Sequence, residues 1–302
     1  MPAPLMGEFL LLAALWGASF LFMRMGASEF GPMATAGMRV SLAAVFLLPA
    51  FAVPGVWQAF RQRLGPILCV GVLNSGLPFA LYAFAVVHAD TGLISIINAT
   101  VPLSGAVVAW LWLGERPDAS RALGLGIGFA GVLLLVLTQS GIGSPQDTGA
   151  SWTLGMLAML ASLMATVCYG LGASFARKYL QGTHPLATAT GSQISASLGL
   201  ALPTLWTWPA TTPGIGAWSA MLAVALLCTS LAYILYFRII AQAGASKALT
   251  VTFVVPVFAM SYGVLFLHEQ ITAWMLICGA IILAGTALAT GLIKVGATRR
   301  AS

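Results

Sequence analysis

Apolar runs of similar length follow one another along nearly the whole chain. A membrane-spanning helix needs about 20 largely apolar residues. Breaks at proline, glycine and charged clusters divide the chain into ten such runs: 5–26, 33–53, 65–87, 91–113, 119–138, 152–177, 184–206, 215–240, 246–267 and 271–294. Only 7% of the residues are charged, whereas a soluble domain carries roughly 25%. The sequence therefore predicts an all-α membrane protein with ten transmembrane helices and membrane lipid around them.

The charged and sulfur-bearing residues argue against nucleic-acid, metal and cofactor binding. The net charge is +6, but the basic residues lie singly or in pairs rather than in a basic patch, so no nucleic-acid partner is expected. The four cysteines lie inside apolar runs and the three histidines at different helix ends, so no metal site is predicted. Residues 126–131 match the dinucleotide fingerprint, but they lie within an apolar helix. Gly124 and Gly128 are therefore interpreted as a helix-packing face, and no cofactor is expected.

The distribution of basic residues predicts the orientation of the chain. With the amino terminus inside, the even-numbered connections and the carboxy-terminal end hold eleven of the 13 Lys and Arg residues. The odd-numbered connections hold only Arg24, and Arg39 lies within the second run. Because cytoplasmic loops are enriched in Lys and Arg, both termini are predicted to be cytoplasmic. Arg39 is interpreted as structural, with a side chain that snorkels to the surface or pairs with Glu29.

The two halves of the chain resemble each other at a nearly constant offset. The matching pairs are Trp16-Gly17 with Tyr169-Gly170 and Arg24 with Arg177 at an offset of 153, then Tyr82 with Tyr236, Pro102 with Pro256 and Glu115 with Glu269 at an offset of 154. Each half holds five runs, an odd number, so the second half is inverted relative to the first. We expect a first repeat in residues 1–140 and an inverted repeat in residues 150–295. At His268, where the first half has Gly114, a different loop geometry is expected.

This pattern resembles the drug/metabolite transporter superfamily, specifically its EamA-like ten-helix branch. The residues that carry the resemblance are Trp16-Gly17, Arg39, Pro102, Leu113-Gly114-Glu115, the glycine-rich fifth run, Pro256 and Glu269. The resemblance implies an exporter of small metabolites in the bacterial inner membrane. Within the branch, the chain is most similar to the YddG-type exporters of aromatic and other amino acids.

Neutral polar and aromatic residues at membrane depth form the candidate substrate site. They occur at matching positions in both repeats, which favours a shared cavity suited to zwitterionic or amphipathic metabolites. Interhelical packing is the alternative interpretation of each residue. The predicted substrate-binding residues are Trp16, Asn74, Tyr82, Asn98, Tyr169, Tyr236 and Thr252, and helix kinks are predicted at Pro78, Pro102 and Pro256. Pro102 is expected to free the carbonyl of Asn98, and Pro256 that of Thr252.

Transport of small molecules by alternating access is the predicted function, with amino acids as the first candidates. A broad multidrug exporter is the alternative within transport. A membrane-embedded enzyme would need a base, nucleophile or metal cluster at one depth, and the runs offer none. No Asp or Glu lies at the centre of a run, so movement down the substrate gradient or exchange is expected rather than obligatory proton coupling. The sequence indicates no oligomeric state.

Overall fold

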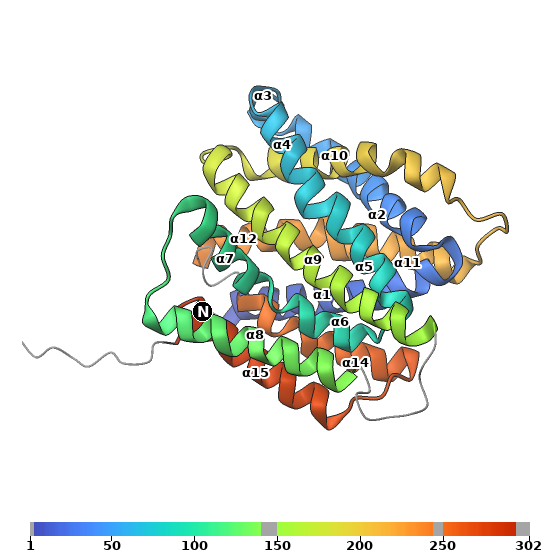
Figure 1. The fold of residues 1–302 in the computed structure, drawn as a ribbon. Helices are drawn as coiled ribbons and strands as arrows, with labels where there is room; N and C mark the ends of the chain where they lie inside the picture. The colour runs from blue at the N-terminus through green and yellow to red at the C-terminus, as the bar shows by residue number, and fades with distance from the viewer. Residues whose placement is uncertain (1–2, 140–149, 244–249, 294–302) are drawn as a thin grey trace, which may run out of the picture.

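The computed structural model describes residues 3–139, 150–243 and 250–293, and every regular element in these ranges is helical (Figure 1). The elements of the first half are α1 (Ala3–Phe30), α2 (Pro32–Leu47), η1 (Leu48–Ala52), α3 (Val56–Gln62), α4 (Leu64–Gly71), η2 (Val72–Gly76), α5 (Leu77–His88), α6 (Thr91–Asn98), α7 (Val101–Leu113) and α8 (Ala119–Gln139). Those of the second half are α9 (Ala150–Tyr179), α10 (Pro185–Trp206), α11 (Ile215–Ala225), η3 (Leu226–Leu231), α12 (Ala232–Ala243), η4 (Thr250–Phe253), α14 (Val255–Leu267) and α15 (Ala273–Ala289).

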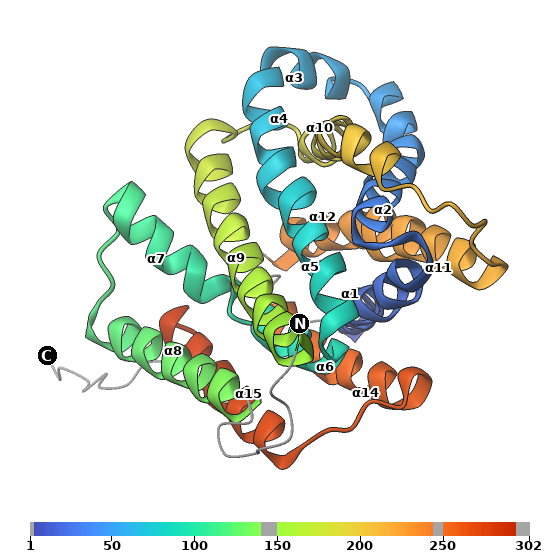
Figure 2. The same cartoon turned by 45° about the vertical axis from the view of Figure 1, so that its right-hand side comes forward.

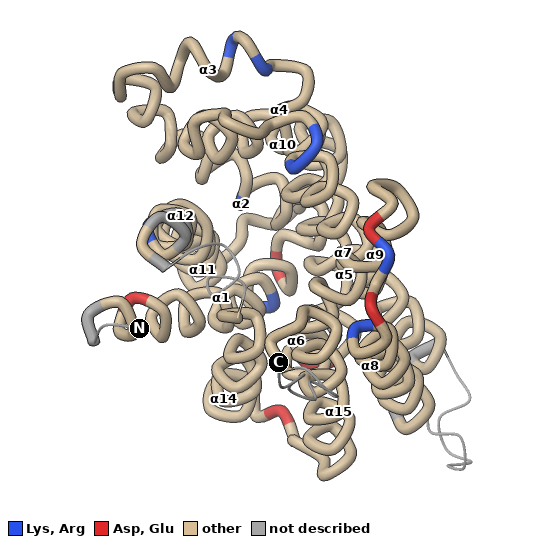
Figure 3. The backbone as a smooth tube through the Cα atoms, turned by 90° about the vertical axis from the view of Figure 1, so that its left-hand side faces the viewer, with Lys and Arg blue, Asp and Glu red and all other residues tan. Residues whose placement is uncertain are grey.

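Eight helical segments are long and apolar enough to cross a membrane, and they coincide with eight of the ten predicted runs. The other two runs are also helical. One is α10, whose 22 residues include polar side chains such as Thr190, Ser192 and Gln193, which lower its hydropathy. The other contains α15, which has 17 residues. Charged residues are sparse along the backbone and gather mainly at helix ends and connections (Figure 3).

Two spans are interrupted at corresponding positions. α6 ends at Asn98 and α7 begins at Val101, while α14 begins at Val255 after the 3-10 turn η4. Pro102 and Pro256 each lie in the first turn of the second helix. A first-turn N–H has no acceptor within its helix, so proline there removes no hydrogen bond. The prolines predict bends within continuous helices, but at Pro102 and Pro256 the structure instead starts a new helix.

Two other spans contain a π-helical turn, again 154 residues apart. η2 joins α4 to α5, and η3 joins α11 to α12. In η3, the hydroxyl of Thr229 donates to the Val224 carbonyl at 2.9 Å, and Ser230 donates to the Ala225 carbonyl at 3.0 Å. Pro78 lies in the first turn of α5, directly after η2. Apolar periodicity carries no signal for such turns, which are common at functional sites.

The ends of α7 and α14 share one geometry, contrary to the expectation at His268. Gly114 follows α7 with φ 75°, and His268 follows α14 with φ 56°, so both residues are left-handed. The next backbone N–H closes each helix in the same way: Glu115 donates to Ala109 at 3.3 Å and Glu269 donates to Gly263 at 3.1 Å. These bonds hold His268 in a conformation that glycine adopts more readily.

Glycines allow helices of the two halves to approach closely. This close approach occurs twice, at positions that are equivalent in the two halves. A Cβ atom at Gly17 of α1 would lie 3.0 Å from the backbone nitrogen of Ala259 in α14. A Cβ atom at Gly170 of α9 would lie 3.0 Å from the backbone nitrogen of Gly105 in α7. An offset of 153 takes Gly17 to Gly170, and an offset of 154 takes Gly105 to Ala259. The same contact is therefore made twice, with the halves exchanged.

The last helices of the two halves, α8 and α15, lie side by side (Figures 1 and 2). Gly128 of α8 meets the backbone of Gly285 in α15, and Gly124 faces the Gly285 carbonyl and the Ala289 nitrogen. This confirms the predicted small-residue packing face at Gly124 and Gly128. α2 and α10, the second helices of the two halves, also pack against each other.

Candidate functional site

Two aromatic pairs join the halves inside the bundle. Trp16 of α1 packs on Tyr236 of α12, with ring centroids 5.2 Å apart and planes at 47°. Tyr82 of α5 stacks on Tyr169 of α9, with centroids 6.3 Å apart and planes at 27°. The repeat offsets convert one pair into the other, since Trp16 corresponds to Tyr169 and Tyr82 to Tyr236. Four of the seven predicted substrate-binding residues thus form two equivalent contacts.

The Tyr82 side of this arrangement also holds Asn98. The Tyr82 hydroxyl donates to Asn98 Oδ1 at 2.9 Å, and Phe20 meets the Tyr82 ring edge-on at 5.8 Å between centroids. Asn98 is the last residue of α6, so the interruption of the span places its amide beside the aromatic pair. Tyr82 is buried, whereas Trp16, Asn98, Tyr169 and Tyr236 are half-buried.

The other predicted site residues lie apart from these contacts. Thr252 is buried within η4, the second half's counterpart of the Asn98 interruption. Asn74 lies in η2, with its amide against Gly172 of α9, about one helical turn beyond Tyr169. Pro256 lines an apolar groove of about 170 Å³ between α6, α14 and α15. That groove is not lined by the aromatic pairs.

Arg39 is buried among neutral groups, an arrangement that the sequence reasoning missed. Its side chain neither snorkels nor pairs with Glu29, whose carboxylate accepts the Gly214 N–H at 2.5 Å. Arg39 is 5% exposed; Nε donates to Thr229 Oγ1 at 3.1 Å and Nη1 to Met23 Sδ at 2.8 Å. Its guanidinium lies 3.7 Å from the ring centroid of Phe79. Within the described ranges no carboxylate pairs with it, although a charge at membrane depth costs about 2.5–3.5 kcal/mol on insertion scales.

The second half has a neutral counterpart of this interaction. Gln193 of α10 donates from Nε2 to Ser75 Oγ in η2 at 2.9 Å. An offset of 154 takes Arg39 to Gln193 and Ser75 to Thr229. Each half therefore ties its second helix to the π-helical turn of the other half, but only one tie is charged. The repeat offset shows from the sequence that Arg39 corresponds to Gln193, but the groups that the two side chains contact are known only from the structure.

An ion cluster with a buried carboxylate lies at the end of the bundle where α5 connects to α6. Arg24 Nη1 donates to the Ala89 carbonyl at 3.0 Å and lies 3.9 Å from Glu269 Oε1. The Glu269 carboxylate, 7% exposed, accepts the backbone N–H of Thr91 at 2.8 Å, the Thr91 hydroxyl at 2.9 Å and the Gly92 N–H at 3.2 Å. A carboxylate at a helix N-terminus is favoured by the helix dipole, so Glu269 holds α6 against the end of α14. We call these residues the Arg24–Glu269 cluster.

Asp90, which precedes α6, lies beside this cluster. Burial raises the pKa of the Asp90 carboxyl, the negative charge of Glu269 raises it further, and the positive charge of Arg24 opposes both effects. The Asp90 carboxyl thus lies in the electrostatic field of both Glu269 and Arg24.

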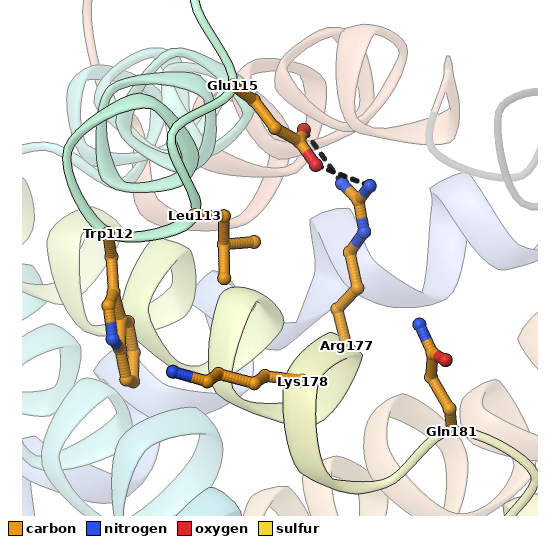
Figure 4. Close-up of a pocket in the computed structure, with 6 residues that line it drawn as sticks. All are labelled: Trp112, Leu113, Glu115, Arg177, Lys178 and Gln181. Carbon is orange, nitrogen blue, oxygen red and sulfur yellow. Dashed lines mark hydrogen bonds and ion pairs between the residues drawn. The ribbon is translucent and has the colours of Figure 1, made fainter.

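The opposite end, where α7 connects to α8, holds the equivalent pair in an exposed setting. Arg177 Nη1 donates to Glu115 Oε2 at 2.8 Å, and the two side chains are 58% and 43% exposed. The pair lies at a pocket of about 310 Å³ whose other lining residues are Trp112, Leu113, Lys178 and Gln181 (Figure 4). The offsets take Arg24 to Arg177 and Glu115 to Glu269, so this contact too is made twice with the halves exchanged.

Comparison with known proteins assigns this architecture to a family. The family model described as the EamA-like transporter family matches residues 5–137 and again residues 156–291. The chain belongs to the EamA-like transporter family. It is therefore a multi-pass membrane transporter. Each matched segment carries one residue of each aromatic pair: Trp16 and Tyr82 in the first, Tyr169 and Tyr236 in the second.

Two relatives that match this EamA-like transporter over most of their own length are named as a transporter and an exporter. "Uncharacterized transporter YvbV" of Bacillus subtilis is 25% identical over 88% of this chain and 84% of its own length. "Probable terminal-alkyne amino-acid exporter" of Streptantibioticus cattleyicolor is 23% identical over 92% of this chain and 90% of its own. A solved crystal structure with 19% identity covers 97% of this chain and 98% of its own, with a TM-score of 0.66, and shows the shared fold.

Proposed function

We propose that this EamA-like transporter exports small amphipathic metabolites, with amino acids as the first candidates, across a bacterial inner membrane by alternating access. Both termini are proposed to be cytoplasmic, with ten spans in two inverted five-helix halves. The observation that carries the proposal is the exchange of the aromatic pairs Trp16–Tyr236 and Tyr169–Tyr82 between the halves.

The exchanged contacts support a two-fold relation between the halves. If a residue of the first half contacts one of the second, a two-fold axis requires their equivalents to be in contact as well. The aromatic pairs, the glycine contacts, the ties to the π-helical turns and the Arg–Glu pairs all meet this requirement. Inverted repeats of this kind place a transporter's binding site between the halves near the membrane midplane.

The neutral aromatic interior supports an amphipathic substrate with an apolar body. Trp16, Tyr82, Tyr169 and Tyr236 offer ring faces, and the half-buried Asn98 amide offers polar contacts. The relative named as a probable terminal-alkyne amino-acid exporter supports amino acids as substrates. A broad-specificity drug exporter is the second candidate, because aromatic walls also suit apolar cations.

The difference between the two ends supports alternating access. The side chains of Arg24 and Glu269 are 33% and 7% exposed, whereas those of Arg177 and Glu115 are 58% and 43% exposed and lie beside a pocket. Equivalent contacts in unequal environments are expected when one face of a transporter is closed and the other is open.

Reconstitution of the full chain in liposomes tests the proposal. We expect saturable movement of labelled phenylalanine down its gradient, competed by other amino acids and not by an apolar cationic dye. Because no Asp or Glu was found at the centre of a span, an imposed pH gradient alone should produce no accumulation. Asn98→Ala and Thr252→Val should alter substrate selectivity at unchanged protein level. Dye movement without amino-acid movement would favour the drug exporter, and unaltered selectivity in both variants would leave these residues a packing role.

A further inference from the structure

We infer that Arg39 is the group that recognises a carboxylate on the transported molecule. This inference rests on the proposed function and narrows its substrate class to amphipathic monocarboxylates, zwitterions included. The cation lies within the second span, and no carboxylate of the described chain forms an ion pair with it.

The hydrogen bonds of Arg39 leave donors over. A guanidinium has five N–H donors, and Arg39 uses one on Nε toward Thr229 and one on Nη1 toward Met23. Nη2 donates to no group among the described residues, and Arg39 remains 5% exposed. A planar guanidinium with free donors matches a carboxylate.

The structural role of this position does not require a charge. Gln193, the counterpart of Arg39, makes the equivalent bond to a π-helical turn with a neutral amide. Joining the second helix of one half to the π-helical turn of the other therefore needs only a donor. The permanent charge in the first half needs another explanation, and an anionic group of the substrate supplies one.

Arg39 also lies next to the candidate site. Phe79, whose ring centroid lies 3.7 Å from the guanidinium, precedes Tyr82 by three residues in α5, and Tyr82 stacks on Tyr169. Thr229, the acceptor of Arg39 Nε, lies in the π-helical turn of the span that carries Tyr236. A substrate whose apolar body rests on these rings can thus place its carboxylate toward Arg39.

The test compares three ligands with one apolar body: phenylalanine and phenylalaninamide differ in the carboxylate, and phenylalanine and 3-phenylpropanoate differ in the ammonium group. Binding of phenylalanine, 3-phenylpropanoate and phenylalaninamide to the purified full chain is measured from ligand-dependent thermal stabilisation. We expect both carboxylates to bind at least about tenfold more tightly than the amide, the effect of a hydrogen bond to a charged group. Arg39→Gln copies the side chain of the other half and should reduce this preference to below about threefold.

A matched variant separates recognition from folding. Gln193→Met removes the equivalent tie to Ser75 and should lower stability while the carboxylate preference stays. Arg39→Lys keeps the charge, and retained preference in that variant supports the inference even where Arg39→Gln does not fold. Equal binding of phenylalanine and its amide by the natural chain would overturn it, as would a tenfold preference retained by folded Arg39→Gln.

Failure of the proposed function has a different signature. Carboxylate-selective binding that depends on Arg39, without movement of any of the three compounds across liposome membranes, would overturn export and leave the inference standing. Movement of phenylalanine and phenylalaninamide at equal rates, with equal binding, would overturn the inference and leave export standing.

Discussion

The first and second halves of the chain make several of the same contacts with their partners exchanged, yet two of these contacts differ in character. Arg39 reaches Thr229 where Gln193 reaches Ser75, so one tie is charged and the other is neutral. Glu269 is buried in its cluster, whereas Glu115 is exposed in its pair.

The contacts that are alike in the two halves can be distinguished from the contacts that differ between them. The features that the halves share position the helices: glycine contacts, π-helical turns and left-handed helix ends. The features that differ lie where the proposed function requires asymmetry, at the proposed substrate contact and at the face that is proposed to open. Variants at equivalent positions can therefore separate the two classes.

The largest effects are expected at the shared glycine contacts. Gly17→Ala and Gly170→Ala each place a Cβ atom against the backbone of a helix in the other half. Both should lower the free energy of unfolding by about 3 kcal/mol, the upper range for overpacking a well-packed contact. Thermal and denaturant unfolding in detergent measures this. Gly126→Ala, where a Cβ would meet open space, is the control and should be neutral or stabilising. Strong loss at only one of the two glycines would break the equivalence of the halves.

Unequal effects are expected at the Arg–Glu contacts. Glu269→Gln removes the charge of a buried carboxylate that accepts three hydrogen bonds, and should cost about 2 kcal/mol of stability. Glu115→Gln disrupts an exposed pair and should cost less than about 1 kcal/mol. The same unfolding measurement compares them. Equal losses would contradict the assignment of one closed and one open end.

Helices were predictable from the sequence because lipid demands long apolar runs. The apolar runs located the eight candidate spans, and Gly124 and Gly128 were correctly interpreted as a packing face. The breaks within spans were less predictable. Pro102 and Pro256 marked the positions, but hydropathy does not distinguish a bent helix from two helices in series.

The side-chain contacts between the two halves could not be derived from the residue pattern within each apolar run. Polar or aromatic character at membrane depth predicts Tyr82, Asn98 and Tyr169 as site residues, and the structure brings them together. The cost of an isolated charge in lipid predicts that Arg39 snorkels to the surface or pairs with Glu29. Its actual neighbours, Thr229 and Met23, depend on how three separate spans pack, which no single run encodes.

The smallest effect is expected at Asp90. Because burial and Glu269 raise its pKa, the folded state favours the protonated carboxyl, and stability falls as pH rises from the ordinary value near 3.8 through the raised one. Asp90→Asn should therefore stabilise the protein at neutral pH, by about 0.5 kcal/mol for a partly exposed group. This gain should vanish below the ordinary pKa. Unfolding midpoints of both proteins across pH measure it, and a gain independent of pH would contradict the assigned cause.

The inverted relation of the halves is the central claim, and Ser28 and Gln181 test it most directly. These residues are separated by the repeat offset of 153, both are exposed, and each follows the arginine of an Arg–Glu contact by four residues. In a chain whose four native cysteines are replaced, Ser28→Cys and Gln181→Cys are treated with a membrane-impermeant thiol reagent on intact cells. The account predicts that Ser28→Cys reacts from outside and that Gln181→Cys reacts only after the membrane is opened. Reaction of both positions from the same side would contradict it.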